Sequence, residues 1–232
     1  MSVIYLIRHG QASFGADDYD QLSDLGKQQS AILGKALANR LNQFDVVSLG
    51  SMQRHAQTAS SCLAVMGQDF DTIETQIDPG WNEYDHADIL AQLRPELTTA
   101  QSTTAFIARQ KNPKQVFEKV FNQAIDRWVD GRYDDYTETW KNYKTRVKTA
   151  LQTLVEENEN AKHIAVFTSG GPISLLSQSL LGVPEQNIMQ LNWTLVNCGI
   201  TRLVATSSRT FLSSLNEHVH FEGENKRFIT YK

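Results

Sequence analysis

Short apolar runs alternate along the first part of the chain with longer stretches of helical spacing. Residues 3–7 are apolar and rich in β-formers, and apolar positions then recur every three or four residues from 22 to 41, behind Ser23 as the expected N-cap. The unit repeats with a strand at 45–49 and a helix at 53–66. This alternation predicts a mainly parallel sheet with helices on both faces.

The middle of the chain interrupts this alternation. After a further short strand at 72–77, no strand pattern appears between residues 88 and 158, and two stretches, about 114–130 and 136–157, have helical periodicity. We therefore expect an inserted helical cap at about residues 87–158. Its aromatic side chains are expected to form the cap core rather than to contact substrate; they include Phe106, Phe117, Trp128, Trp140 and Tyr143.

The strand and helix pattern then returns. A strand is expected at 163–167, followed by a glycine pair and a helix over 173–181 that ends at Gly182. Two late strands, roughly 196–205 and 210–216, complete the sheet.

The predicted fold class is α/β. It is a three-layer α/β/α sandwich with a mainly parallel central sheet and an inserted helical cap, formed by one domain over residues 1–232. The polar tail after Glu217 is expected to be partly mobile.

Composition and charge exclude several classes of function. The 232 residues are 41% hydrophobic with a formal net charge of -4, and no apolar stretch approaches the roughly 20 residues that span a bilayer. We therefore expect no nucleic-acid partner and no membrane anchor. Cys62 and Cys198 have neither disulfide nor metal-ligand spacing, and the start MSVIYLIRHG lacks a secretory pattern, so we expect a cytoplasmic protein with reduced thiols.

Polar residues follow the predicted strands where ligands bind in open α/β sheets, outside the carboxyl ends. Because a protein without broad positive charge must capture an anion locally, the arginines in this set are the most informative residues. The residues at the four strand ends are Arg8, His9 and Gly10, then Ser51 and Arg54, then Glu83, and finally Thr168, Ser169, Gly170 and Gly171.

In their order and spacing, these residues resemble the histidine phosphatase superfamily, which includes phosphoglycerate mutases and acid phosphatases. The resemblance covers most of the chain. It rests on Arg8-His9-Gly10, the run Leu22-Ser23-Asp24-Leu25-Gly26 with Gln29, the run from Ser51 through Arg54 to Ala59, Glu83, and the pair Gly170-Gly171.

The resemblance implies a role for each matching residue. His9 would attack phosphorus through a neutral imidazole nitrogen and form a phosphohistidine that water hydrolyses. Arg8 and Arg54 would grip the phosphoryl oxygens, Gly10 would let the backbone approach the phosphate, and Glu83 would protonate the leaving oxygen. No metal and no cofactor are implied.

The chain departs from the family at one position. The family usually has a second histidine in a Ser-His-Gly-Gly turn, whereas this chain reads Thr168-Ser169-Gly170-Gly171. A serine hydroxyl donates one hydrogen bond but brings no positive charge. Either another histidine compensates, with His86 as the candidate, or the protein is a slow phosphatase or a weakly active phospho-ligand binding module.

The remaining polar residues are weighed against ordinary surface roles. His55, His163, His218 and His220 are expected to be exposed. Ser13 is a candidate for an extra phosphate contact, at even odds against an ordinary loop serine.

Ser169 after a strand also suggests an α/β-hydrolase nucleophile, but only one glycine of that motif is present. The turn at Ser169 and Gly170 fits better as a helix N-terminus that offers N–H groups to an anion.

Mutase and phosphatase activities differ in their loops. The loop at residues 11–20 is acidic and lacks the Asn-containing pattern of the glycolytic mutases, and no long Arg-rich lid segment follows. This favours a phosphatase over a mutase, which remains the alternative. We expect a small phosphorylated substrate as partner, and a homodimer is an open alternative to a monomer.

Overall fold

A mixed sheet forms the centre of the protein in the computed structural model, which describes residues 1–13, 20–206 and 208–231. Within these residues the strand order is β3-β2-β4-β1-β5-β6. β1 pairs in parallel with β4, β4 with β2 and β2 with β3, whereas β5 and β6 run antiparallel at the other edge. The strands are β1 (Ser2–Arg8), β2 (Val46–Leu49), β3 (Thr75–Ile77), β4 (His163–Thr168), β5 (Ile200–Ala205) and β6 (Thr210–Glu217).

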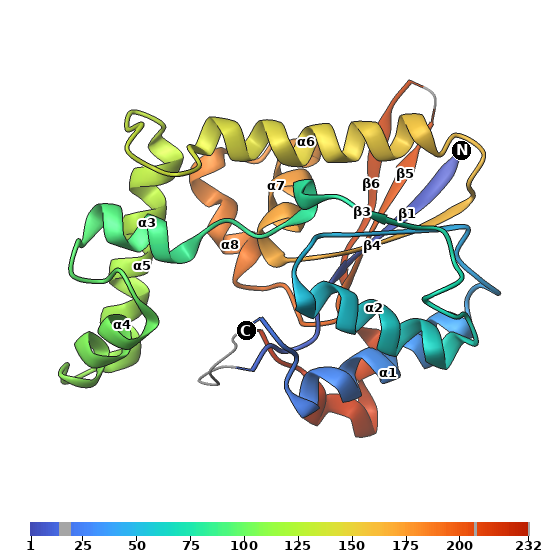
Figure 1. Cartoon of the computed structure of the whole chain (residues 1–232), viewed down its shortest axis with the longest axis horizontal. Helices are drawn as coiled ribbons and strands as arrows, with labels where there is room; N and C mark the ends of the chain where they lie inside the picture. The colour runs from blue at the N-terminus through green and yellow to red at the C-terminus, as the bar shows by residue number, and fades with distance from the viewer. Residues whose placement is uncertain (14–19, 207, 232) are drawn as a thin grey trace.

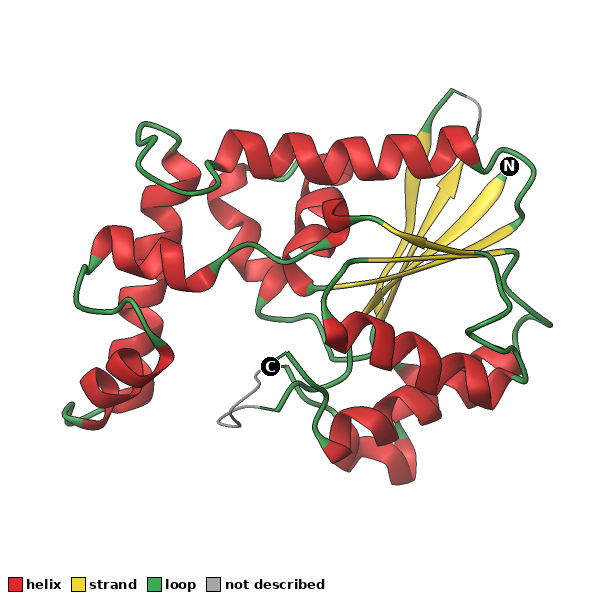
Figure 2. Ribbon diagram, in the orientation of Figure 1, coloured by secondary structure: helices red, strands yellow, loops and turns green. Residues whose placement is uncertain are grey.

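Helices cover both faces of this sheet (Figure 1, Figure 2). α1 (Asp24–Ala38) and α2 (Gln53–Met66) pack on one face, where Leu33 and Leu63 join a buried cluster with Ile7. α6 (Trp140–Glu157) and α7 (Gly170–Leu181) cover the other face. The result is the predicted three-layer α/β/α sandwich, which confirms the fold class.

The predicted cap contains more helices than the sequence indicated. Besides α5 (Pro113–Asp130), it includes α3 (His86–Leu93) and α4 (Ala100–Ala108), and these three lie to one side of the sandwich (Figure 1). α6 belongs to the same insertion but packs on the sheet, since Val147 and Leu154 share a buried cluster with Ile4. Short helical segments complete the chain: η1 (Pro79–Trp81), η2 (Glu185–Asn187), α8 (Ile188–Asn192), η3 (Val219–Phe221) and η4 (Gly223–Phe228).

Local signals in the sequence set several element boundaries correctly. Ser23 caps α1 by accepting a hydrogen bond from the amide of Gly26, as expected of an N-cap, and α2 spans the predicted residues. Gly182 ends α7 in the left-handed conformation with φ 66°, which a residue with a side chain rarely adopts. The aromatic residues Trp128, Trp140 and Tyr143 are buried together in the cap, as predicted.

The tail after Glu217 was wrongly expected to be partly mobile. Phe221 and Phe228 are buried against the α1 face of the sheet. Gln29 of α1 donates hydrogen bonds to the Phe228 carbonyl at 2.7 Å and to the Thr230 hydroxyl at 2.7 Å. The tail is ordered because its two aromatic side chains and its backbone have partners that sequence polarity did not reveal.

Within the described residues, no helix is long and apolar enough to cross a membrane.

The buried tail generates a stability prediction. Phe221 is fully buried, with 0% exposure, whereas Val219 two residues earlier is 54% exposed. We expect Phe221→Ala to lower the free energy of unfolding by about 3 kcal/mol and Val219→Ala to change it by less than about 0.5 kcal/mol. Urea unfolding of both variants measures the difference. Equal, small effects would show that the tail contributes nothing to the folded core.

Candidate active site

His9 lies directly after β1 and is buried. The His9 Nδ1 lies 2.7 Å from the carbonyl oxygen of Gly10, to which it donates, and its Nε2 lies 3.2 Å from the Nε of Arg54. Burial, together with the positive charges of Arg54 and Arg8, lowers the pKa of His9 well below the usual range. The ring is therefore neutral, with its proton on Nδ1 and a lone pair on Nε2 that faces a guanidinium.

Hydrogen bonds from β4, α2 and Asn197 fix the backbone of His9 and Gly10. The amide of His9 donates to Thr168 at the end of β4, and the side-chain amide of Asn197 donates to the His9 carbonyl, both at 2.9 Å. The amide of Gly10 donates to the Thr58 hydroxyl of α2. A Cβ on Gly10 would lie 2.5 Å from the carbonyl oxygen of Gly26, so close packing against α1 already requires glycine there.

Arg54 holds a carboxylate as well as the imidazole of His9. Its Nη1 lies 2.7 Å from one oxygen of Asp20, and the other oxygen accepts from the amide of Gln53 at 2.8 Å, at the start of α2. A guanidinium and a helix N-terminal amide are the donors that phosphoryl oxygens use. Asp20, from the acidic loop, thus makes contacts of the kind that a phosphoryl group would make here.

Arg8 is directed toward the C-terminal tail. Its Nη1 donates to the carbonyl oxygens of Leu195 and Tyr231. A Cβ on Gly170 would lie 3.6 Å from the Arg8 Nε, so the side chain also passes the N-terminus of α7. Arg8 therefore joins the end of β1, the tail and the start of α7, and its charge acts on His9.

Glu83 is hydrogen-bonded to the glycine pair that begins α7. One carboxylate oxygen accepts from the amide of Gly171 at 3.1 Å, and a Cβ on Gly171 would lie 2.0 Å from the other oxygen. Any side chain at position 171 would therefore displace the carboxylate. The sequence predicted that Glu83 follows the third strand; in the structure η1 lies between β3 and Glu83.

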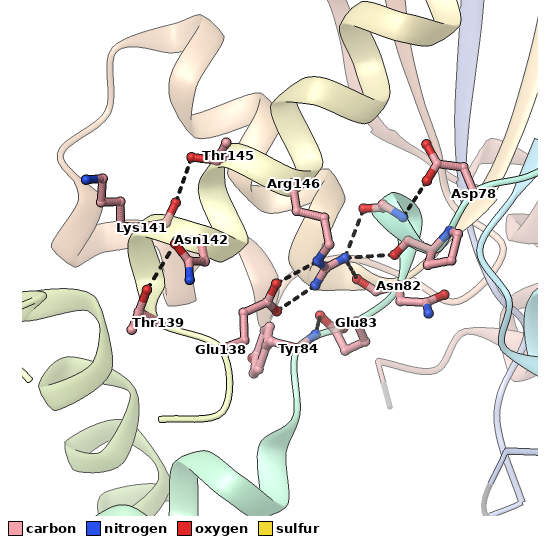
Figure 3. A network of polar contacts seen from close by, with 12 residues as sticks. Asp78, Asn82, Glu83, Tyr84, Glu138, Thr139, Lys141, Asn142, Thr145 and Arg146 are labelled. Atoms are coloured by element: carbon pink, nitrogen blue, oxygen red, sulfur yellow. Dashed lines mark hydrogen bonds and ion pairs between the residues drawn. The ribbon is translucent and has the colours of Figure 1, made fainter. Parts of the chain in front are cut away.

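Arg146 of α6 holds the segment that presents Glu83 (Figure 3). Its Nη1 donates to the carbonyl oxygens of Pro79, Gly80 and Asn82 at 3.0, 3.0 and 3.1 Å. Its Nε and Nη2 each donate at 2.7 Å to the Glu138 carboxylate. One guanidinium thus binds three carbonyl groups of the short segment immediately before Glu83.

Ser169 pairs with a histidine that the sequence did not single out. Its hydroxyl lies 2.8 Å from the Nε2 of His55, and both residues are fully buried. The rings of His55 and His9 lie 5.8 Å apart, centroid to centroid. The expectation that His55 is exposed was wrong, because position 55 lies on the inward stripe of α2 with Ala59 and Cys62.

The whole chain was compared with known protein families and structures. The family model of the histidine phosphatase superfamily (branch 1) matches residues 4–218. The chain belongs to the histidine phosphatase superfamily.

Individual relatives are distant. A 60-residue segment is 38% identical to the mitochondrial serine/threonine-protein phosphatase Pgam5 of Caenorhabditis briggsae, and it covers 26% of this chain and 21% of that protein.

Solved structures show the same fold along almost the whole chain. Bacillus stearothermophilus YhfR is 16% identical, with 96% of this chain and 100% of that chain covered and a TM-score of 0.69. A phosphoglycerate mutase from Bacillus anthracis is 15% identical, with 94% of each chain covered and a TM-score of 0.64. A mutant phosphoserine phosphatase from Entamoeba histolytica in complex with phosphoserine is 19% identical, with 95% and 99% covered and a TM-score of 0.62.

The structure brings most of the predicted site residues together, and the others lie around them. His9, Gly10 and Arg54 are in direct contact, and Glu83 reaches the turn of Ser169 and Gly170 through Gly171. The site residues are far apart in the chain. They meet because β1, β2 and β4 are adjacent in the sheet and their carboxyl ends lie at the same end of it.

His86 and Ser13 are less directly connected to the site. The His86 ring lies against Tyr84 and Phe121 of the cap, with centroids 4.5 and 5.7 Å away. Burial lowers its pKa, against the opposing charge of Glu83, and so electrostatically it belongs to the site. The Ser13 amide donates to the Gln21 carbonyl at the base of the acidic loop, whose residues 14–19 lie outside the described part.

No group of three or more His, Cys, Asp or Glu side chains within the described residues is arranged to hold a metal ion.

The buried His55 generates a prediction for the pH dependence of stability. Burial, with the charge of Arg54, lowers the pKa of His55 to about 3. Unfolded, the ring titrates near 6.5, so as pH falls below about 6.5 the unfolded chain gains a proton that the folded chain does not bind. The contribution of His55 is therefore fully present above about pH 6.5 and is lost as the pH falls toward 3.

We expect His55→Gln to reduce the slope of unfolding free energy against pH by up to about 1.4 kcal/mol per pH unit between about pH 6 and 4. Urea unfolding at a series of pH values measures the slope. Ser177→Ala, a buried change on α7 without a titrating group, serves as control. An unchanged slope in His55→Gln would contradict the buried, neutral histidine.

Proposed function

We propose that the protein is a phosphatase that hydrolyses a phosphate monoester through a phosphohistidine on His9. The observation that supports this most directly is the orientation of the His9 ring. The Gly10 carbonyl retains the proton on Nδ1, and Nε2 faces Arg54 with its lone pair. A neutral nucleophile beside a guanidinium is what attack on an anionic phosphoryl group requires.

The reaction then has two steps. The Nε2 of His9 attacks phosphorus, the ester P–O bond breaks, and Glu83 gives its proton to the leaving oxygen to release the alcohol. Water next attacks the phosphorus of phosphohistidine and loses a proton to Glu83, the P–N bond breaks, and inorganic phosphate leaves. Arg54 and Arg8 stabilise the charge on the phosphoryl oxygens in both steps.

The acidic loop favours a phosphatase over a mutase. Asp20 forms an ion pair with Arg54, and a carboxylate there opposes small, highly charged phosphoacids. We propose a small phosphorylated substrate of lower charge, a reaction without metal or cofactor, and a cytoplasmic location. Phosphoglycerate mutase-type transfer is the alternative, and Ser169 in place of a second histidine leaves open a weakly active binding module.

Replacement of the nucleophile tests the proposal. We expect His9→Ala to lower kcat for para-nitrophenyl phosphate by at least about 1,000-fold and to abolish acid-labile phosphate labelling of the protein, since the covalent route is removed. Steady-state kinetics and acid-quenched labelling measure the two effects. His163→Ala, at the opposite end of β4, is the matched control. Wild-type activity in His9→Ala would disprove the phosphohistidine route.

The Arg146 contacts generate a second prediction. Arg146→Met leaves Glu138 and three backbone carbonyls without their donor, and we expect a loss of about 2 kcal/mol in unfolding free energy. We also expect a fall in kcat of about 10-fold or more, with a smaller change in KM, because the proton donor Glu83 loses its position.

Arg132→Met is the control, since Arg132 pairs with Asp130, two residues earlier in the chain, and its side chain is 75% exposed. Kinetics with para-nitrophenyl phosphate and urea unfolding compare the two variants. If Arg146→Met lowered stability but kept the full kcat, the network would serve only the fold.

A further inference from the structure

Ser169 has an unusual arrangement for a residue at the start of a helix. It occupies the N-cap position of α7, directly after β4, but its hydroxyl accepts no hydrogen bond from the amides of that helix. The hydroxyl instead lies 2.8 Å from the Nε2 of His55 on α2. Serine at this position usually accepts from the amides of its own helix, whereas this hydroxyl has its hydrogen-bond partner on α2.

The first turn of α2 serves both His9 and Ser169. Arg54 donates from Nε to the Nε2 of His9 at 3.2 Å, and the next residue, His55, meets Ser169. The backbone of His9 pairs with Thr168, so Ser169 lies beside the nucleophile along the sheet edge. The hydroxyl, the guanidinium and the imidazole nucleophile therefore surround one small region.

The position of His55 leaves its ring little freedom. A Cβ on Gly50 would lie 2.4 Å from the Nδ1 of His55, so glycine at that position makes room for the ring. The side chain is fully buried. A hydroxyl rotates freely unless a partner fixes it, and a fully buried imidazole nitrogen 2.8 Å away is such a partner.

We propose that Ser169 contacts the phosphoryl group during its transfer to His9, and that His55 is the positioning residue that orients the Ser169 hydroxyl. In this state the His55 Nε2–H donates to the Ser169 oxygen, and the hydroxyl proton is donated to a phosphoryl oxygen. No bond to Ser169 or His55 forms or breaks. The inference rests on the proposed function, and it assigns to His55 the compensation that the sequence had suggested for His86.

The test uses four variants of the full chain: His55→Ala, His55→Gln, Ser169→Ala and the double variant His55→Ala with Ser169→Ala. Kinetics with para-nitrophenyl phosphate give kcat and KM, calorimetry gives the affinity for inorganic phosphate, and thermal unfolding checks the fold. Ser177→Ala, buried on the same helix, and His163→Ala are the matched controls.

We expect Ser169→Ala and His55→Ala each to lower kcat by about 100-fold, as the loss of one donor to a transition state does. The kcat of the double variant is expected to be no lower than that of the less active single variant, because both changes remove the same contact. His55→Gln retains a donor near the position of Nε2 and is expected to recover activity relative to His55→Ala. A purely structural role of His55 would not respond to this rescue.

Several results would overturn the inference. One is near-wild-type kcat in His55→Ala, and another is a double variant whose loss is the product of the two single losses. A large loss in His86→Ala with none in His55→Ala would give the role to His86. In ¹⁵N NMR of the phosphate complex, an unprotonated Nε2 on His55 would also contradict it.

Failure of the proposed function is a separate result. If the wild type hydrolyses no phosphomonoester and forms no phosphohistidine, the phosphatase proposal fails. The contact between Ser169 and the phosphoryl group is then tested by binding alone. Inorganic phosphate must bind the wild type more tightly than it binds Ser169→Ala and His55→Ala. Equal affinities in the three proteins would overturn the inference whatever the turnover.

Discussion

The site depends on keeping His9 neutral while it is buried among positive charges. A charged imidazole would lose its hydration and would be repelled by Arg54 and Arg8, so burial and charge act in the same direction. The Gly10 carbonyl then determines which nitrogen keeps the proton. Arg54 and Arg8 thus act together with burial to keep the His9 ring unprotonated, and the same positive charges make this region attractive to an anion.

The fold meets this requirement by bringing distant segments to the carboxyl ends of the parallel strands. β1 and β4 are adjacent and parallel, so His9 and Ser169 lie side by side although they are far apart in the chain. α2 begins near these strand ends, and its first turn carries both Arg54 and His55. The tail closes the site from the far side, where Asn197 joins the His9 carbonyl to Thr230.

The sequence predicted elements with strong local signals and missed contacts between distant segments. The sequence showed the periodicity of α2, the Ser23 cap and the order of the polar residues that follow the strands. His55 was misjudged as exposed because a single histidine is usually polar surface, although its helical phase with Ala59 and Cys62 indicated burial. The buried tail and the Arg146 network depend on partners more than 50 residues away, which no local pattern contains.

Glu83 is held both by the sandwich and by the inserted helices. Its carboxylate is held by Gly171 on the sheet side, while its backbone segment is held by Arg146 of α6. α6 packs on the sheet through Val147 and Leu154, so this helix of the insertion is one of the layers of the sandwich. The cap helices α3 to α5 connect to the site directly after Glu83, through Tyr84 and His86. Glu83 is therefore anchored between α7 and α6, at the point where the chain enters the cap.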